Sequence, residues 1–392
     1  MRILRSLRPA LAAAILLVAA CDEVESQDRA HGTTSESPGD DSSLFGTYLA
    51  ARFAESQRDL TSAADFYAQA LALDPTSADL RKGAFIAMLS DGLCDEIVPL
   101  ARKIAAEDSK FPLSRLVLAI AAIRDGDYAA AEAEIAALPK LQLNEIVLPM
   151  ARAWTVAGDG KYDAALEALR PLADRQGFQT FHDLHAALIK DIAGDAEGAE
   201  ESYLAALGDD EQPPARLVQA LASFYARHGR LAEAKELVAR QYEGNGGSEL
   251  LKEMQLKIQA TGKVPPVATN AREGFAESLF DVASAFFREG SSRFGLIYGQ
   301  LALMAAPDFP AAQMLVAEVL DSQERYEQAN EMLGRIDSSS VFYWPAQTRI
   351  ASNLNALGET DQAIQKLEEL AARRQNDSYP LIDMADILRS KE

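Results

Sequence analysis

The side chains of this 392-residue chain that could do chemistry are few and scattered. His182 and His185 are three residues apart, so on a helix both imidazoles would share one face and could bind a metal ion, but no third ligand is marked beside them. The acid pairs Glu200-Glu201 and Glu368-Glu369 fall where a solvated helix face is expected. No HExxH, GxSxG or glycine-rich phosphate loop occurs. We therefore predict that the protein is not an enzyme and has no catalytic residue, metal, cofactor or small-molecule substrate.

Cys21 has the most specific chemical context in the chain. The opening MRILRSLR supplies three arginines and no acid, and PALAAAILLVAA follows as an apolar run that is too short to span a bilayer and is typical of a secretion signal. The segment Val18-Ala19-Ala20-Cys21 resembles the bacterial lipobox, in which the cysteine becomes the lipidated N-terminus. We expect a lipoprotein signal peptide over 1–20 and acyl chains on Cys21. The alternative is an ordinary signal peptide cleaved near the same alanines.

Lipidation would also set the compartment. Two or more acyl chains attach a protein stably to a membrane, so the body would face the periplasm of the bacterial envelope. Asp22 resembles a signal that retains some lipoproteins in the inner membrane, but that rule varies between bacteria, so both membranes stay open. Residues 21–42 are acidic and almost free of bulky apolar side chains, which predicts a disordered tether. Cys94 would then lack a disulfide partner, and we expect it to be a small buried residue near a repeat turn.

The charge balance limits the class of partner. Aspartate and glutamate number 59 against 38 lysines and arginines, a formal net charge of -21. Such a field repels nucleic acid, whose binding depends on neutralising phosphates, and it accommodates basic or neutral proteins more easily. We therefore expect protein or peptide partners and no nucleic acid.

The elements that must position these side chains are helices, because the sequence repeats every 34 residues. From Ala63, equivalent positions follow in steps of 34 to Ala199, then at Ala234, and the period resumes at Gly295 after a gap of 61. Twelve residues before this marker, eight of nine repeats have alanine, and five residues before it, seven of nine have glycine. Small residues let two helices approach closely, and glycine carries the backbone through a tight turn. Each period is therefore predicted to be a helical hairpin within a stack.

This pattern resembles the tetratricopeptide repeat family over about residues 44–389. The best matches are Ala63/Tyr67/Ala70/Pro75 and Gly290/Gly295/Gly299/Ala302/Pro307. The second repeat departs from it, with Phe85 and Ile97 where small residues belong, and the aromatic residue expected near the start of the first helix is mostly missing. The resemblance implies an all-α fold, a right-handed α-solenoid of tetratricopeptide helix-turn-helix repeats. The structural repeat positions are Ala51, Ala63, Ala119, Ala131, Ala153, Ala165, Ala187, Ala199, Ala222, Ala234, Ala283, Gly295, Ala317, Ala329, Ala351 and Ala363.

The period also divides the chain into two blocks. A first solenoid block is predicted over 43–243 with about six repeats, and a second over 274–392 with three repeats plus a terminal helix. Between them, 244–273 is an irregular spacer that begins with glycines, continues as a helix-like stretch and breaks at Gly262 and Pro265-Pro266. We expect a hinge or a change of superhelical direction there.

A candidate peptide groove follows from the family resemblance. In this family the first helix of each hairpin lines the concave face, and its positions 2, 5, 9 and 12 point into the groove. In the second block these positions are more polar and aromatic, including Glu277, Phe280, Ser284, Phe287, Glu318 and Asp321. In repeats two to four the apolar residues at these positions are Ile86, Leu89, Leu113, Leu116, Ile120, Ile123, Val147, Met150 and Trp154. A continuous apolar stripe on an open face predicts a site for an apolar or amphipathic segment. The alternative is that tight curvature or the N-terminal segment already covers this face.

The leading prediction is a non-enzymatic, membrane-anchored periplasmic scaffold or adaptor. The chain resembles bacterial envelope lipoproteins of this repeat family, which implies envelope proteins or peptides as partners in assembly or export. The alternative is the non-catalytic repeat portion of a longer or truncated protein whose C-terminal part carries further repeats or an enzyme domain. This alternative stays open because the terminal helix, expected over Ser378–Leu388, is not followed by a second helix.

Overall fold

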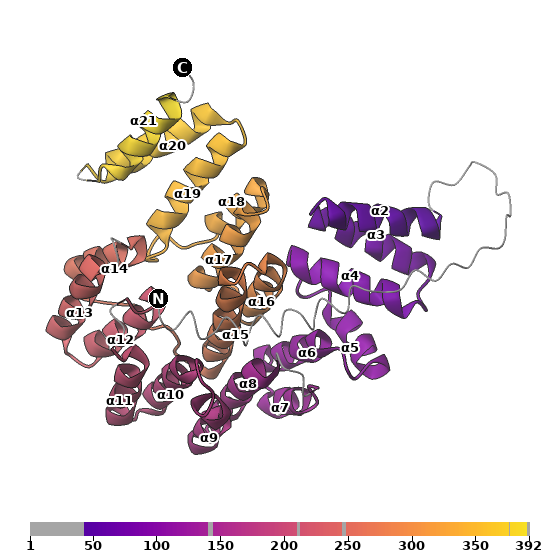
Figure 1. Ribbon diagram of the computed structural model, residues 1–392, viewed down its shortest axis with the longest axis horizontal. Helices are drawn as coiled ribbons and strands as arrows, with labels where there is room; N and C mark the ends of the chain where they lie inside the picture. The colour runs from indigo at the N-terminus through magenta and orange to yellow at the C-terminus, as the bar shows by residue number, and fades with distance from the viewer. Residues whose placement is uncertain (1–42, 140–143, 210–211, 245–247, 376, 390–392) are drawn as a thin grey trace.

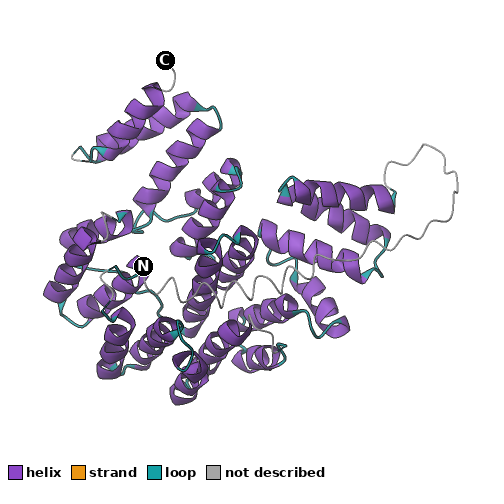
Figure 2. Ribbon diagram, in the orientation of Figure 1, coloured by secondary structure: helices purple, strands orange, loops and turns teal. Residues whose placement is uncertain are grey.

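The computed structural model describes residues 43–139, 144–209, 212–244, 248–375 and 377–389. Within these ranges the chain forms twenty helices and no strand (Figure 2). The helices follow one another as antiparallel hairpins in a curved stack (Figure 1). The prediction of an all-α solenoid of helical hairpins is therefore confirmed. The predicted signal peptide, Cys21 and the acidic tether lie outside the described residues.

Each hairpin consists of two helices, which range from 9 residues in α7 to 18 in α15. The helices of the first block are α2 (Leu44–Ser56), α3 (Leu60–Leu73), α4 (Ala78–Asp91), α5 (Val98–Glu107), α6 (Pro112–Arg124), α7 (Tyr128–Ala136), α8 (Asn144–Gly158), α9 (Tyr162–Ala173), α10 (Gln179–Ala193), α11 (Ala196–Leu207), α12 (Ala215–Arg227) and α13 (Leu231–Gly244). They are followed by α14 (Glu249–Thr261), α15 (Ala271–Arg288), α16 (Ser292–Ala305), α17 (Pro310–Asp321), α18 (Tyr326–Gly334), α19 (Tyr343–Ala356), α20 (Thr360–Arg373) and α21 (Tyr379–Arg389).

One residue with a left-handed backbone makes the turn inside each hairpin. The nine turn residues, which lie five positions before the repeat marker (Ala63 and its equivalents), all have a positive φ between 62° and 86°. Seven of them are glycine. Arg58 and Glu324 adopt the same conformation, each with φ of 62°, although a Cβ atom disfavours it. They are the non-glycine residues with positive φ in the described part of the chain. The hairpin therefore imposes this turn even where the sequence lacks the residue best suited to it.

The small residues inside the hairpins are buried. The fifteen alanines among the structural repeat positions are each at most 1% exposed. Gly295 is also buried, and a Cβ atom there would lie 3.1 Å from the Cβ of Phe287. Larger side chains at these positions would push the two helices of a hairpin apart, which explains why the structural repeat positions hold small residues.

The second block begins inside the curve of the first. Helix α15 contacts α8 and α10, and α16 contacts α4 and α6, so residues far apart in sequence lie side by side (Figure 1). One continuous core cluster runs from Phe85 to Ala346 and includes both blocks. Smaller clusters lie at the two ends, around Ala51 to Ala87 and around Trp344 to Ile387. The chain thus turns back and fills the concave side of its own first block.

The described part of the spacer joins the two blocks closely. Gly262, with φ of 67°, caps the C-terminal end of α14. The following segment runs along α12, where Ser223 Oγ donates to the Val264 carbonyl at 3.1 Å. On the other side of α14, Lys252 pairs with Asp377 at 3.1 Å, and Arg374 holds Glu253 through two hydrogen bonds. The spacer is therefore packed against both blocks. No helix in the described ranges is both long and apolar enough to cross a bilayer.

Candidate protein-binding surface

The predicted apolar groove of repeats two to four is covered by the chain itself. Ile86 and Leu113 are half-buried and pack against the central core. The residues that are at most 2% exposed are Leu89, Leu116, Ile120, Ile123, Val147, Met150 and Trp154. Helices α15 and α16 lie on the helices that carry these side chains. The expectation of an open groove is therefore not met here, because α15 and α16 cover this face.

Trp154 shows how closely the two blocks meet. Its side chain is 1% exposed, and it lies against the backbone of α15 at Gly274. A Cβ atom at Gly274 would lie 2.3 Å from the ring carbons of Trp154, closer than real carbon contacts allow. Glycine at this position therefore lets a helix backbone rest directly on the indole ring.

A buried polar chain accompanies this contact. Trp154 Nε1 donates to His185 Nδ1 at 3.1 Å, and His185 Nε2 lies 3.2 Å from an Asp281 carboxylate oxygen on α15. Because Nδ1 accepts the hydrogen bond from the indole N–H, a ring proton on Nε2 faces Asp281. His185 is fully buried, whereas His182 contacts the neighbouring Asp183 at 2.8 Å. Among the described residues, no three histidine, cysteine, aspartate or glutamate side chains converge as metal ligands.

Arg216 and Glu277 form a second link between the blocks. Arg216 of α12 makes two hydrogen bonds to the Glu277 carboxylate of α15, at 2.9 and 2.6 Å, and the Glu277 side chain has no exposed surface. Burial raises the pKa of Glu277, although the Arg216 guanidinium opposes this shift. Glu277 was expected at an open groove position, and it instead faces the concave side of the first block. Two concave faces thus meet at this ion pair.

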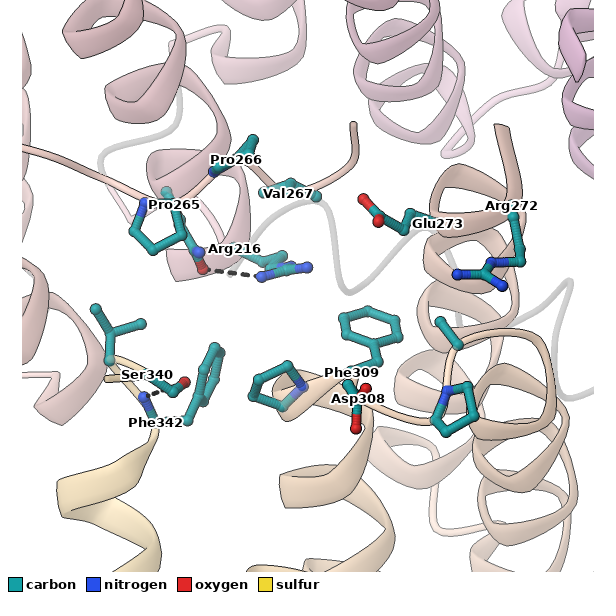
Figure 3. Close-up of a pocket in the computed structure, with 15 residues that line it drawn as sticks. Arg216, Pro265, Pro266, Val267, Arg272, Glu273, Asp308, Phe309, Ser340 and Phe342 are labelled. Carbon is teal, nitrogen blue, oxygen red and sulfur yellow. Dashed lines mark hydrogen bonds between the residues drawn. The ribbon is translucent and has the colours of Figure 1, made fainter. Parts of the chain in front are cut away.

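A cavity of about 320 Å³ lies beside this link. Figure 3 shows Arg216 between the loop that carries Pro265 and Pro266 and the ring of Phe309, whose centroid is 5.2 Å from the guanidinium carbon. Phe342 closes another side of the cavity. Arg216 therefore contacts both a buried carboxylate and an aromatic ring at the junction of the two blocks.

Cys94 lies at the same junction, nearer the N-terminus. It is a free, half-buried cysteine two residues after the Gly92 turn, and its thiol donates to the Gln300 carbonyl of α16 at 3.8 Å. Burial raises the pKa of the Cys94 thiol to about 11. Such a thiol is a poor nucleophile near neutral pH.

The concave face is open farther along the second block. A cleft of about 540 Å³ lies between α14, α17, α19 and α21. Four of its lining residues, Pro345, Thr348, Ser352 and Asn355, occupy positions 2, 5, 9 and 12 of the first helix of the ninth repeat. The same register that predicted the first-block groove would have identified them. Sequence reasoning missed them because it followed the apolar stripe, and these residues are mostly polar.

Acidic side chains dominate the charge of this cleft. Glu249, Asp383 and Asp386 line it, and Arg349 is the basic residue among its lining side chains. Arg349 already pairs with Asp321 at 3.5 Å. Burial raises the pKa of Asp383, and the nearby Asp386 carboxylate adds to the shift. Burial likewise raises the pKa of Glu249. A cation in the cleft would relieve this repulsion.

Comparisons with known proteins provide few constraints. No protein-family model matches the chain, and no curated protein matches it. Similar solved structures include the Naa15/Naa10 complex bound to HypK-THB, with a TM-score of 0.35, 15% identity, and coverage of 88% of this chain and 55% of that one. The P58(IPK) TPR domain matches with a TM-score of 0.24 and 13% identity, over 88% of this chain and 97% of that one. The APC/C hetero-tetramer Cut9-Hcn1 matches with a TM-score of 0.31 and 12% identity, over 79% of this chain and 55% of that one. The chain thus spans about half of the matched chains in the first and third structures. Because these identities and TM-scores are low, we base no conclusion about partners on them.

Proposed function

We propose that the protein is a non-enzymatic scaffold of the bacterial envelope, which binds a segment of another protein in the open cleft of its second block. The observation that carries this proposal is the contrast between its two concave surfaces. The first is filled by α15 and α16, whereas the second is a cleft of about 540 Å³ lined by groove positions of α19. A concave surface formed by repeat helices suits an extended or helical segment of a partner.

The cleft favours a partner segment that carries lysine or arginine. Its acids, Glu249, Asp383 and Asp386, outnumber its single arginine, and Tyr379 offers a half-exposed ring beside them. A basic side chain would pair with the carboxylates, while its aliphatic stem would pack on the ring. The net charge of -21 would also steer a basic partner toward the protein.

Photo-crosslinking tests the binding site. A photoreactive amino acid at Ser352, which is exposed in the cleft, should trap a discrete partner in cells. The matched control is Glu368, which is exposed on the opposite helix of the same hairpin and should trap none. Substituting Asp383→Lys and Asp386→Lys should remove the Ser352 product, because both acids are then replaced by repelling charges. Equal trapping from Ser352 and Glu368, or a product that survives the charge reversal, would refute the site.

The membrane attachment is a separate part of the proposal and rests on Val18-Ala19-Ala20-Cys21. Labelled palmitate should be incorporated into the wild-type protein and lost in Cys21→Ser, while Cys94→Ser should keep the label. Incorporation that persists in Cys21→Ser would contradict lipidation at this residue. Either result leaves the cleft experiment interpretable, since the cleft lies far along the chain from Cys21.

A further inference from the structure

Helix α2, the first helix of the described residues, presents an apolar face that no other described helix covers. Thr47, Ala51 and Ala54 face inward and pack on α3. On the outer side are five large apolar residues, with exposed fractions between 38% and 71%: Leu44, Phe45, Tyr48, Leu49 and Phe53. In a repeat stack, terminal faces are normally polar, because they have no neighbour to bury them. An exposed patch of this kind indicates a binding surface.

The charges of α2 set it apart from the rest of this acidic chain. Within the helix, Arg52 and Glu55 are the charged residues, and they pair at 3.2 Å. Glu55 also lies 3.5 Å from Arg293. The helix thus carries no uncompensated acid, although the whole chain has a net charge of -21. A surface that bears negative lipid headgroups would be repelled less here than by most of the molecule.

The helix at the other end of the described stack, α21, differs from α2 in its charge. Helix α21 also exposes apolar side chains, including Leu381, Ile382 and Leu388, but Asp383 and Asp386 lie among them. Carboxylates at an interface with lipid are costly to desolvate. The two helices lie at opposite ends of the molecule (Figure 1). The C-terminal face is therefore a matched comparison for α2, similar in apolar exposure and different in charge.

We propose that the outer face of α2 lies on the lipid bilayer, with Phe45, Leu49 and Phe53 inserted at the level of the headgroups. The inference rests on the proposed lipidation of Cys21, which is 22 residues before Ser43. A chain of this length behaving as the predicted tether has a root-mean-square span of about 25 Å, so α2 would be held close to the membrane at high effective concentration. Even modest insertion of aromatic and aliphatic side chains would then dock the helix.

Depth-dependent fluorescence tests this docking on the full chain purified from membranes. An environment-sensitive fluorescent amino acid replaces Phe53, or Ile382 as the control, and the protein is reconstituted in vesicles of phosphatidylethanolamine with a minor fraction of phosphatidylglycerol. Including lipids with a nitroxide on the acyl chain should quench most of the emission from position 53 and leave position 382 unchanged. The pair Phe45→Ser and Leu49→Ser should lower the ratio of docked to undocked protein roughly tenfold or more. Leu381→Ser should have no effect on the probe at position 53.

The other outcomes overturn the proposal. Emission from position 53 that shifts to the blue with protein concentration but is not quenched by nitroxide lipid would show that a second copy covers the face. Emission from position 53 that stays typical of a water-exposed probe, both at high protein concentration and with vesicles present, would show that nothing covers the outer face of α2. Mass spectrometry of the N-terminal peptide reports separately on acylation. Unmodified Cys21 would refute the anchor, and the quenching of unanchored protein by added vesicles would still report on α2.

Discussion

Removing the guanidinium of Arg216 should loosen the contact between the two blocks, and the size of the effect follows from burial. Arg216→Met keeps most of the aliphatic stem but leaves the Glu277 carboxylate, which has no exposed surface, without its two hydrogen bonds of 2.9 and 2.6 Å. Breaking a buried ion pair by removing one partner costs about 3–5 kcal/mol. The matched control is Arg170→Met, since Arg170 pairs with Glu167 at 3.0 Å and both side chains are more than 60% exposed. Its cost should be at most about 1 kcal/mol.

The pH dependence distinguishes two causes of destabilisation: a buried Glu277 carboxylate without an ion-pair partner, and lost packing against Phe309. The pKa of Glu277 is raised by burial, and Arg216 opposes that shift, so Arg216→Met should raise the pKa further. A carboxyl group whose pKa is higher in the folded state favours folding at low pH, and this contribution is lost as pH rises through the folded pKa. The deficit of Arg216→Met should therefore be largest near pH 7.5 and shrink toward about pH 5. Glu277→Gln in the same background should recover part of it at neutral pH.

The assay combines urea unfolding, followed by circular dichroism, with hydrogen exchange of α15. Exchange is needed because circular dichroism would not detect an undocking of α15 that leaves the helices intact, whereas exchange reports such local opening directly. The α15 amides should exchange faster in Arg216→Met at neutral pH and approach wild-type protection on acidification. A deficit no larger than that of Arg170→Met, or one independent of pH, would refute the claim that Arg216 stabilises a buried charged carboxylate.

Three further changes test the packing and the turns. Gly274→Ala should lower the free energy of unfolding by about 1–3 kcal/mol, because the new methyl group meets the ring of Trp154; a change near zero by urea unfolding would contradict this contact. Gly126→Ala, at φ of 77°, should destabilise by about 1 kcal/mol, and Glu324→Gly, at φ of 62°, should stabilise by a similar amount. Thermal unfolding midpoints that move in the same direction for both would contradict the common turn. At neutral pH, iodoacetamide should modify native Cys94 about 100-fold more slowly than the urea-unfolded chain, since burial raises its pKa to about 11; equal rates would contradict that burial.

The local architecture could be predicted because it depends on residues close together in sequence. The contact between the helices of a hairpin needs a small residue at a given position, and the alanines of Ala63 and Ala363 are fully buried as that requirement demands. The turn needs a left-handed residue five positions earlier, and Arg58 and Glu324 show that the register holds even without glycine. Helix α21, observed over Tyr379–Arg389, likewise lies within one residue of the segment expected from the period.

The open and filled surfaces could not be predicted in the same way. Trp154 and Ile120 lie at the register positions that face the concave side, but apolar character at such a position is compatible with either an open groove or a core. The deciding contacts join residues far apart in sequence. Arg216 and Glu277 are separated by 61 residues, and Cys94 and Gln300 by 206. No periodic pattern marks pairs of this kind.

The sequence by itself therefore determined the helical hairpins, their register and the buried small residues, because each depends on backbone geometry within one repeat of about 34 residues. Only the tertiary structure decided which concave face is available to a partner. Small rotations between successive repeats accumulate into the curve of the solenoid, and the packed spacer directs α15 into that curve. The apolar stripe of the first block thus became core, and the polar cleft of the second block stayed open.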